Sequence, residues 1–427
     1  MNNKLFILFI SLFGCIHGTF AYDCIIDGVA YNRISNTDFE VTYKNGYSND
    51  YSGDITIPQT IIYKGKTFTV TKIGEQSFKG NTIKSITLPN SIKVIGSDAF
   101  GDCKINSNKI TIPSSVKEME LRAFAFLKVK EVHINDLQSW CLIKMGNMAS
   151  PLYGNSADLY LNGKTIVDLV IPNGIKSIGA FSFSHTNIKT LSIPISVDSI
   201  ANGASYGCDN LESVTIPNSV KYIGIECFSQ CNSLEKAVFP NNKSITIRNQ
   251  AFSYCRSLKY ITLSPCLTEI ETALFSGCSS LETITIPDNV EKIGAGAFKY
   301  CYNLSKIVLP EKLVRIGGDA FGYDENIETI IIKAKNPPVI EYRLNRTFDS
   351  SITTFASLYV PKNSIELYRN APGWNEFYDI YDIATSIKTI APSPIDDAIY
   401  DLRGGRMINS YLNPGIYIKG GKKILIK

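Results

Sequence analysis

Histidine and tryptophan are scarce in this chain of 427 residues, which holds three of the first and two of the second. Beyond residue 21 only His133 and His185 remain, and no recognisable motif places a Ser or Cys nucleophile beside either one. The HExxH, paired Cys-x-x-Cys, EF-hand, P-loop and dinucleotide glycine motifs are also missing. The sequence therefore predicts no cofactor and no metal site, and it predicts that the protein is not an enzyme.

Concentrated charge is missing as well. The chain has 43 Lys and Arg against 39 Asp and Glu, a formal net charge of +4, and it contains no block of basic residues. Nucleic-acid binding needs a basic patch or stripe. We therefore expect no nucleic-acid partner.

What the chain does have is a repeated phrase of about 23 residues. The segment Leu211 to Cys231, LESVTIPNSVKYIGIECFSQC, is nearly repeated from Leu281 to Cys301. One position of the repeat is nearly always phenylalanine, and we call the set of equivalent positions in successive repeats a column. Nine phenylalanines and Ser205 occupy this column, which makes ten repeats. The phenylalanines are Phe78, Phe100, Phe124, Phe183, Phe228, Phe252, Phe275, Phe298 and Phe321. A fixed period in the twenties predicts a curved, β-rich repeat solenoid.

Each repeat predicts two short extended pieces and a turn. In the Leu211 copy, Val214 and Ile216 alternate toward the inside of a first strand, and Pro217 ends it because proline cannot donate to a ladder. Val220-x-x-Ile223 forms a second extended piece. A glycine follows in six repeats, at 74, 96, 179, 224, 294 and 317, and other residues replace it elsewhere, at Glu120, Ala201, Arg248 and Glu271. This site is therefore expected to prefer a permissive backbone without demanding one. Ala-Phe-x-x-Cys is then expected to form a tight helical turn that fills the core.

Eleven cysteines raise the question of disulfides, but six of them share one column, three residues after the phenylalanine position. These are Cys103, Cys208, Cys231, Cys255, Cys278 and Cys301. A repeated slot for a small, buried side chain explains them, because stacked parallel side chains rarely present the torsion of a disulfide. Four others, Cys24, Cys141, Cys227 and Cys266, lie off the column and the repeat does not explain them.

The N-terminal residues 1–21 have the pattern of a secretory signal peptide, with Lys4 before an apolar stretch too short to span a bilayer. Cleavage after Ala21 is expected, and lipid attachment at Cys15 is the alternative. Residues 22–57 alternate like strands and predict an N-terminal cap.

The solenoid is expected over residues 58–335, with an insertion at 132–172 where the phenylalanine spacing is too long for one repeat. A C-terminal cap over 336–383 and a linker over 384–396 follow. The last segment, 397–427, has strand–glycine–strand patterns and predicts a small β tail.

These repeats resemble the BspA-type leucine-rich repeats, also called Treponema-type, of surface proteins from Bacteroidetes and other host-associated microbes. The resemblance runs from about Thr56 to Ala334, where Pro, Ile-Gly, Ala-Phe and Cys-x-x-Leu recur in order. The insertion and the LYVP…Y…W..F segment look like parts common in that family. The tail, with GIYI at Gly415 to Ile418 and GKK at Gly421 to Lys423, is similar to the sorting domain of type IX secretion.

The resemblance implies a bacterial protein that is secreted or attached to the outer-membrane surface after secretion machinery reads its tail. It implies adhesin-like binding of extracellular proteins, host surfaces or other bacteria. Three alternatives stay open: a glycan-capture protein for nutrient uptake, a passive spacer, and an enzyme with two carboxylates across a cleft, although solenoid faces favour repeated columns over a unique pair. The sequence indicates neither the ligand nor the oligomeric state.

The candidate ligand-binding residues lie on two outward columns of the first strands and in the insertion. They are Lys236, Tyr260 and Lys306 in one column, Thr262 and Thr285 in the other, and Trp140. Tyr and Lys are side chains that anchor proteins or stack on sugars. Thr also suits any strand, and packing in the core is the alternative for Trp140.

Overall fold

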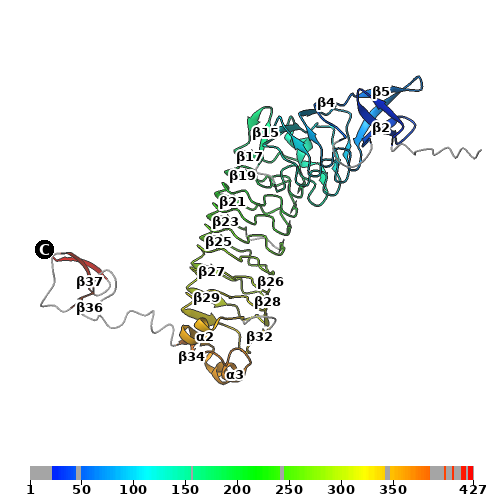
Figure 1. The fold of residues 1–427 in the computed structure, drawn as a ribbon. Helices are drawn as coiled ribbons and strands as arrows, with labels where there is room; N and C mark the ends of the chain where they lie inside the picture. The colour runs from blue at the N-terminus through cyan, green and yellow to red at the C-terminus, as the bar shows by residue number, and fades with distance from the viewer. Residues whose placement is uncertain are drawn as a thin grey trace, which may run out of the picture. The chain divides into compact units, whose positions relative to one another are not determined.

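The computed structural model describes residues 22–44, 50–154, 157–240, 245–341 and 347–384, together with four strands of the tail (Figure 1). The chain divides into two compact units, Met1–Thr165 and Ile166–Lys427, here unit 1 and unit 2. Among the described residues, no helix is long and apolar enough to cross a membrane. Both units are built from stacked turns of a β-solenoid.

Unit 1 begins with a β cap. Its antiparallel strands are β1 (Cys24–Ile26), β2 (Val29–Arg33) and β3 (Asp38–Thr42), and the hairpin of β5 (Thr60–Tyr63) and β6 (Lys66–Ile73) follows. Lys64 and Gly65 join the hairpin with φ values of 49° and 74°, as a type I′ turn requires. The far end of β6 pairs in parallel with the next repeat at Ile73. Cap and solenoid therefore share this strand.

Each solenoid turn of unit 1 contributes one main strand and one second strand. The main strands are β4 (Asp54–Thr56), β8 (Ser85–Thr87), β11 (Lys109–Thr111), β13 (Glu131–Ile134) and β15 (Asp158–Leu161), to which β16 (Lys164–Thr165) adds an antiparallel edge. The second strands after β6 are β9 (Val94–Ile95), β12 (Glu118–Met119) and β14 (Lys144–Met145), and β7 (Thr82–Ile83) pairs with β10 (Lys104–Ile105). Because β4 pairs with β8 in register, the first main strand already lies within residues 22–57.

The segment expected to be an insertion contains a further solenoid turn. Strand β13 pairs with β11, β14 pairs with β12, and the helix α1 (Leu137–Cys141) connects them. The Arg122 N–H donates to Asn147 O at 2.9 Å, as each repeat does to the next, which places Ser150 in the phenylalanine column. The long spacing after Phe124 thus hides a turn whose marker residue is serine.

Unit 2 continues the same plan in two sets of sheets, whose strands form successive rungs in Figure 1. Its main strands are β17 (Asp168–Val170), β19 (Thr190–Ser192), β21 (Ser213–Thr215), β23 (Lys236–Val238) and β25 (Tyr260–Thr262), then β27 (Thr283–Thr285), β29 (Lys306–Leu309) and β31 (Thr329–Ile332). Its second strands are β18 (Ser177–Ile178), β20 (Ser199–Ile200), β22 (Tyr222–Ile223) and β24 (Thr246–Ile247), then β26 (Glu269–Ile270), β28 (Lys292–Ile293), β30 (Arg315–Ile316) and β32 (Val339–Ile340).

The predicted helical turn around each phenylalanine is not formed. In the Phe228 repeat, the N–H groups of Glu226, Phe228 and Gln230 donate to carbonyl oxygens of the next repeat at 3.1, 2.8 and 2.8 Å. Glu226 and Gln230 have positive φ values of 55° and 59°. These backbone conformations direct every second N–H of the segment toward the neighbouring repeat. The turn segment, from two residues before the phenylalanine to two after it, is therefore a third ladder between repeats.

Phenylalanine rings fill the core beside these turn segments. Neighbouring rings stack with centroids 5.0 Å apart for Phe100 and Phe124, and 5.4 Å apart for Phe298 and Phe321. The stack continues to Phe348 at 5.3 Å with planes 2° apart. The column thus runs past residue 335 into the expected C-terminal cap.

That cap closes the solenoid with helices α2 (Ser350–Phe355), η1 (Lys362–Ser364) and α3 (Ile365–Asn370) and with main strands β33 (Ser357–Val360) and β34 (Asp379–Asp382). Trp374 is fully buried and donates from Nε1 to Pro338 O at 2.8 Å. Tyr368 donates from its hydroxyl to Ala334 O at 2.8 Å. These bonds tie the cap to the last turns.

The tail forms an antiparallel sheet of its own, in the order β36-β35-β37-β38. Its strands are β35 (Ile399–Tyr400), β36 (Arg406–Met407), β37 (Gly415–Lys419) and β38 (Lys422–Ile426). The predicted signal peptide and nearly all of the predicted linker lie outside the described residues.

The described cysteines are free thiols, which the repeat predicted for the six of the column only. Each column thiol of unit 2 is buried and donates to the carbonyl oxygen in the phenylalanine column of the preceding repeat. The bonds are Cys208 to Phe183 (3.0 Å), Cys231 to Ser205 (3.2 Å), Cys255 to Phe228 (3.1 Å), Cys278 to Phe252 (3.2 Å) and Cys301 to Phe275 (3.2 Å). The column is therefore a ladder of donors as well as a packing slot.

Candidate binding surfaces

The main strands of unit 2 present an outward column that includes three candidate residues. Lys236 of β23 lies beside Tyr260 of β25 in the paired register. Thr283 of β27 follows beside β25, and it pairs with Lys306 of β29. The column therefore places Lys236, Tyr260 and Lys306 within about 15 Å along the stack, at about 4.8 Å per strand.

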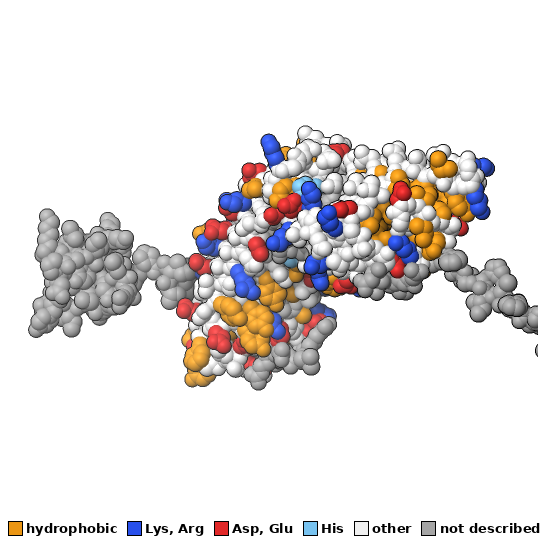
Figure 2. Space-filling view, turned by 45° about the horizontal axis from the view of Figure 1, so that its top comes forward, with side chains coloured by type: hydrophobic (Ala, Val, Ile, Leu, Met, Phe, Trp, Pro, Cys, Tyr) orange, Lys and Arg blue, Asp and Glu red, His pale blue; other side chains and the backbone are white. Residues whose placement is uncertain are grey.

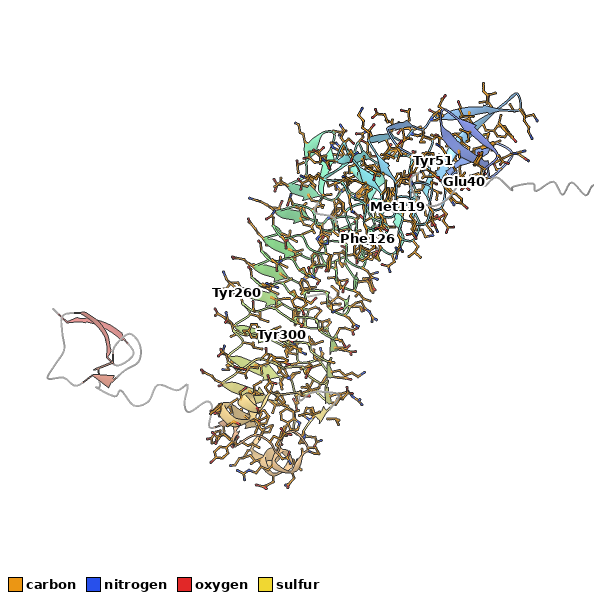
Figure 3. All side chains as sticks on the ribbon, viewed as in Figure 1. Glu40, Tyr51, Met119, Phe126, Tyr260 and Tyr300 are labelled. Carbon is orange, nitrogen blue, oxygen red and sulfur yellow. The ribbon has the colours of Figure 1, made fainter. Side chains whose placement is uncertain are left out.

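Exposure differs among these side chains. Tyr260 is 67% exposed and projects from the outer side of the strand stack (Figure 3). Lys236 is exposed, whereas Lys306 is half-buried, and neither lysine forms an ion pair with another described residue. Thr262 and Thr285 are both exposed in the second outward column. Five of the six predicted residues thus share one face.

Trp140 does not belong to an exposed surface. Its side chain is 2% exposed on α1, a helix that the Asp136 carboxylate caps by accepting the Gln138 N–H at 3.0 Å. The alternative that Trp140 packs in the core is therefore correct. No ligand can stack on this indole while unit 1 stays folded.

A tyrosine cluster on and beside the turn segments of unit 2 was missed by the sequence reasoning. Tyr300 stacks on Tyr323 with centroids 4.9 Å apart, and Tyr302 lies 6.0 Å from Tyr300. The Lys299 ammonium lies 5.2 and 5.1 Å from the Tyr300 and Tyr323 rings and pairs with Asp319 at 3.0 Å. Burial opposes its charge, but the Asp319 carboxylate outweighs this effect and raises the pKa of Lys299. Tyrosine two residues after Phe252, Phe298 and Phe321 was the available signal.

The side chains of His133 and His185 both pack against neighbouring residues. His133, in β13, stacks on Tyr160 at 4.6 Å and bonds Glu131 through Nε2 at 2.8 Å. His185 lies on a turn segment, where its ring covers Gly207, and burial lowers its pKa. No group of three metal-ligating side chains exists among the described residues. The face shown in Figure 2 carries basic and acidic side chains interspersed.

The stacked parallel strands, the phenylalanine column and the short turns define a leucine-rich repeat solenoid. The BspA type leucine rich repeat region matches residues 47–147, 157–246 and 241–352 in six copies. The chain belongs to this family.

Solved structures are similar to this chain at low sequence identity. The pneumococcal vaccine antigen PcpA is 18% identical, with 84% of this chain and 98% of PcpA covered at a TM-score of 0.53. A leucine rich cell surface protein from Faecalibacterium prausnitzii is 20% identical, with coverage of 72% and 94% and a TM-score of 0.40. A leucine-rich repeat protein from Bacteroides ovatus is 22% identical, with coverage of 75% and 100% and a TM-score of 0.38. No curated protein matches the chain.

Proposed function

We propose that this is a secreted or surface-attached bacterial protein that binds an extracellular protein through the strand face of unit 2, without catalysis. The observation that carries the proposal is Tyr260, 67% exposed on a paired strand with Lys236 as its neighbour in register. A tyrosine on a rigid strand offers a large contact area and loses little conformational entropy on binding.

An array of immobilised matrix proteins and soluble glycans tests this proposal with the chain from Tyr22 onward. We expect saturable binding that a triple Lys236→Ala, Tyr260→Ala and Lys306→Ala variant weakens by at least about tenfold, the size of a hot-spot loss. The matched control changes Thr190, Ser213 and Thr329, which lie in the same column, to Ala. Equal loss in both triples, or no loss in the first, would refute binding through these residues.

The glycan-capture alternative draws on the same tyrosine, because an exposed aromatic ring can stack on a sugar. On the array, it predicts soluble-glycan binding that Tyr260→Ala alone abolishes while both lysine changes are tolerated. Protein binding that depends on the lysines favours the adhesin-like function instead.

We further propose that the tail directs type IX secretion, as its similarity to a sorting domain implies. The tail's antiparallel sheet supports its role as a removable signal, since the four described tail strands pair with one another and with no other described strand. Deleting residues 397–427 is expected to remove the protein from the cell surface and the medium while it accumulates inside the cell. Unchanged export of the truncated protein would contradict this role.

A further inference from the structure

Asp324 lies three residues after Phe321, in the last of the ten repeats counted from the sequence. It therefore occupies the position that cysteine holds in other repeats. Its side chain is fully buried, and neither carboxyl oxygen has a hydrogen-bond partner among the described residues. An ionised carboxylate without partners in such a place is costly. The position therefore needs a chemical explanation that the packing alone does not supply.

The register of the column identifies the group that faces Asp324. In the preceding repeats of unit 2 each column thiol donates to the carbonyl oxygen one repeat earlier, as Cys301 does to Phe275 at 3.2 Å. The corresponding acceptor for Asp324 is the Phe298 carbonyl oxygen. That oxygen accepts the Cys301 N–H at 3.1 Å, and no described side chain donates to it. A carboxylate cannot donate to a carbonyl, whereas a carboxylic acid can.

We propose that Asp324 is held as the neutral carboxylic acid, that its O–H donates to the Phe298 carbonyl oxygen, and that loss of this proton loosens the C-terminal cap. Asp324 thus takes the place of the column thiol as a hydrogen-bond donor, and it stops donating when its carboxyl group ionises.

The surroundings of Asp324 favour the neutral form. Burial raises the pKa of Asp324 to about 8, and the Asp349 carboxylate adds to the rise. The Cys301 N–H favours the ionised form, but this N–H already donates to Phe298 O. Among the described residues, the titratable groups that interact with the Asp324 carboxyl are the Cys301 thiol of the preceding repeat and the Asp349 carboxylate at the start of α2. Neither of them brings a positive charge.

Asp324 lies next to the junction between the last repeat and the C-terminal cap, so its ionisation would affect the stability of the cap. Asp349 is the N-cap residue of α2, and its carboxylate accepts the Tyr323 N–H across the junction between the last repeat and the cap. The Phe321 N–H donates to Thr347 O at 3.1 Å across the same junction. Ionising Asp324 would place a second carboxylate at this junction and remove the proposed bond.

The direction of the pH effect follows from linkage. The folded pKa of about 8 exceeds the ordinary value of 3.8, so the folded state keeps a proton that the unfolded state has lost. Stability from this group is complete below the ordinary value and declines as pH rises toward about 8. The unfolding equilibrium constant of the cap should rise by up to about tenfold per pH unit in this window.

The test uses the chain in a Trp140→Phe background, which leaves Trp374 in the cap as the single tryptophan. Urea unfolding followed by Trp374 fluorescence from pH 5 to pH 9 is compared with Asp324→Cys and Asp324→Asn, two neutral donors. We expect the parent to lose stability relative to both variants as pH rises. Glu325→Gln, which removes the exposed neighbouring carboxylate, should keep the parent's pH dependence.

A parent and an Asp324→Cys variant with the same pH dependence would overturn the proposal. Carboxyl carbon NMR of the aspartate-labelled wild-type chain gives a second readout, with Asp324→Asn identifying the signal. We expect this signal to titrate near pH 8. A signal that is fully ionised at pH 6 would also overturn the proposal, whatever the stability of the variants.

Discussion

The Cys255 thiol donates to the carbonyl oxygen of Phe228 at 3.1 Å, and the same oxygen accepts the Cys231 N–H at 3.3 Å. Two successive repeats thus share one acceptor deep in the core. This relationship explains why cysteine recurs three residues after the phenylalanine. A residue of this size that donates a hydrogen bond gives this oxygen a second donor, beside the backbone N–H of its own turn.

The thiol ladder predicts the effect of removing one rung. Cys255→Ala should lower the free energy of unfolding by about 1–3 kcal/mol, because it removes both a donor and a buried sulfur atom. Cys255→Ser keeps a donor and should lose less. Urea unfolding measures both changes, and Cys266→Ala, at a half-exposed site off the column, is the control. Equal losses at positions 255 and 266 would argue against the ladder.

Thiol reactivity should divide the cysteines by position. Burial raises the pKa of the Cys255 thiol to about 12 and that of Cys278 well above its ordinary value, so neither supplies a thiolate near neutral pH. In the chain from Tyr22 onward, we expect a thiol reagent to label the half-exposed Cys24 and Cys266 in the native state. Mass spectrometry locates the label, and fast labelling of Cys255 or Cys278 would contradict the structure.

Two glycines of the turn segments separate steric crowding from backbone strain. Gly203 and Gly296 have similar φ values of 58° and 61°. A Cβ on Gly203 would lie 2.1 Å from Cε1 of Phe181, whereas the nearest atom to a Cβ on Gly296 is 3.8 Å away. We expect Gly296→Ala to cost about 1 kcal/mol and Gly203→Ala about 1–3 kcal/mol more. Thermal unfolding of the pair checks the order, and equal costs would mean that backbone strain alone decides.

His185 should give a pH dependence opposite in direction to that of Asp324. Burial lowers its pKa below the ordinary 6.5, while Asp209 opposes this shift. The unfolded state then takes up the proton first, so stability is present above about 6.5 and declines as pH falls. His185→Asn, which tolerates the φ of 57°, should reduce the decline between pH 7 and pH 5. Urea midpoints at several pH values measure it, and an unchanged decline would contradict the assignment.

The sequence predicted the solenoid well because its markers are core residues. Phe228 and Cys231 must fill a dry interior, so their identities repeat and set the register. Ser150 and Phe348 were not recognised as members of the column, because one lacks the ring and the other follows an irregular spacing. The structure recovers both from the ladder of N–H donors.

The turn segment could not be read from residue type. Glu226 and Gln230 have positive φ, yet neither is a residue that usually indicates this conformation. Hydrogen bonds to the next repeat impose it, and a single repeat does not display them. The glycine that follows β22 had a different cause from the expected one. A Cβ on Gly224 would lie 2.5 Å from Asn202 N, so close approach of the preceding repeat explains this glycine.

The candidate surface was predicted in part. The strand period placed Lys236 and Tyr260 outward and adjacent, and the structure confirms their register. Trp140 could not be placed, because a helix inside an irregular repeat has no periodicity to indicate its buried side. Tyr300 and Tyr323 lie one period apart, but their contact depends on turn geometry that the sequence did not reveal.

The most direct measurement of the central claim is site-specific photo-crosslinking to a partner found on the array. A benzophenone side chain replaces Tyr260 on the strand face in one protein, and Tyr302 of the tyrosine cluster in another. The exposed fractions of these two side chains are 67% and 49%. If the strand face binds the partner, position 260 crosslinks to it and position 302 does not. Crosslinking from position 302 alone would contradict the account and assign binding to the tyrosine cluster.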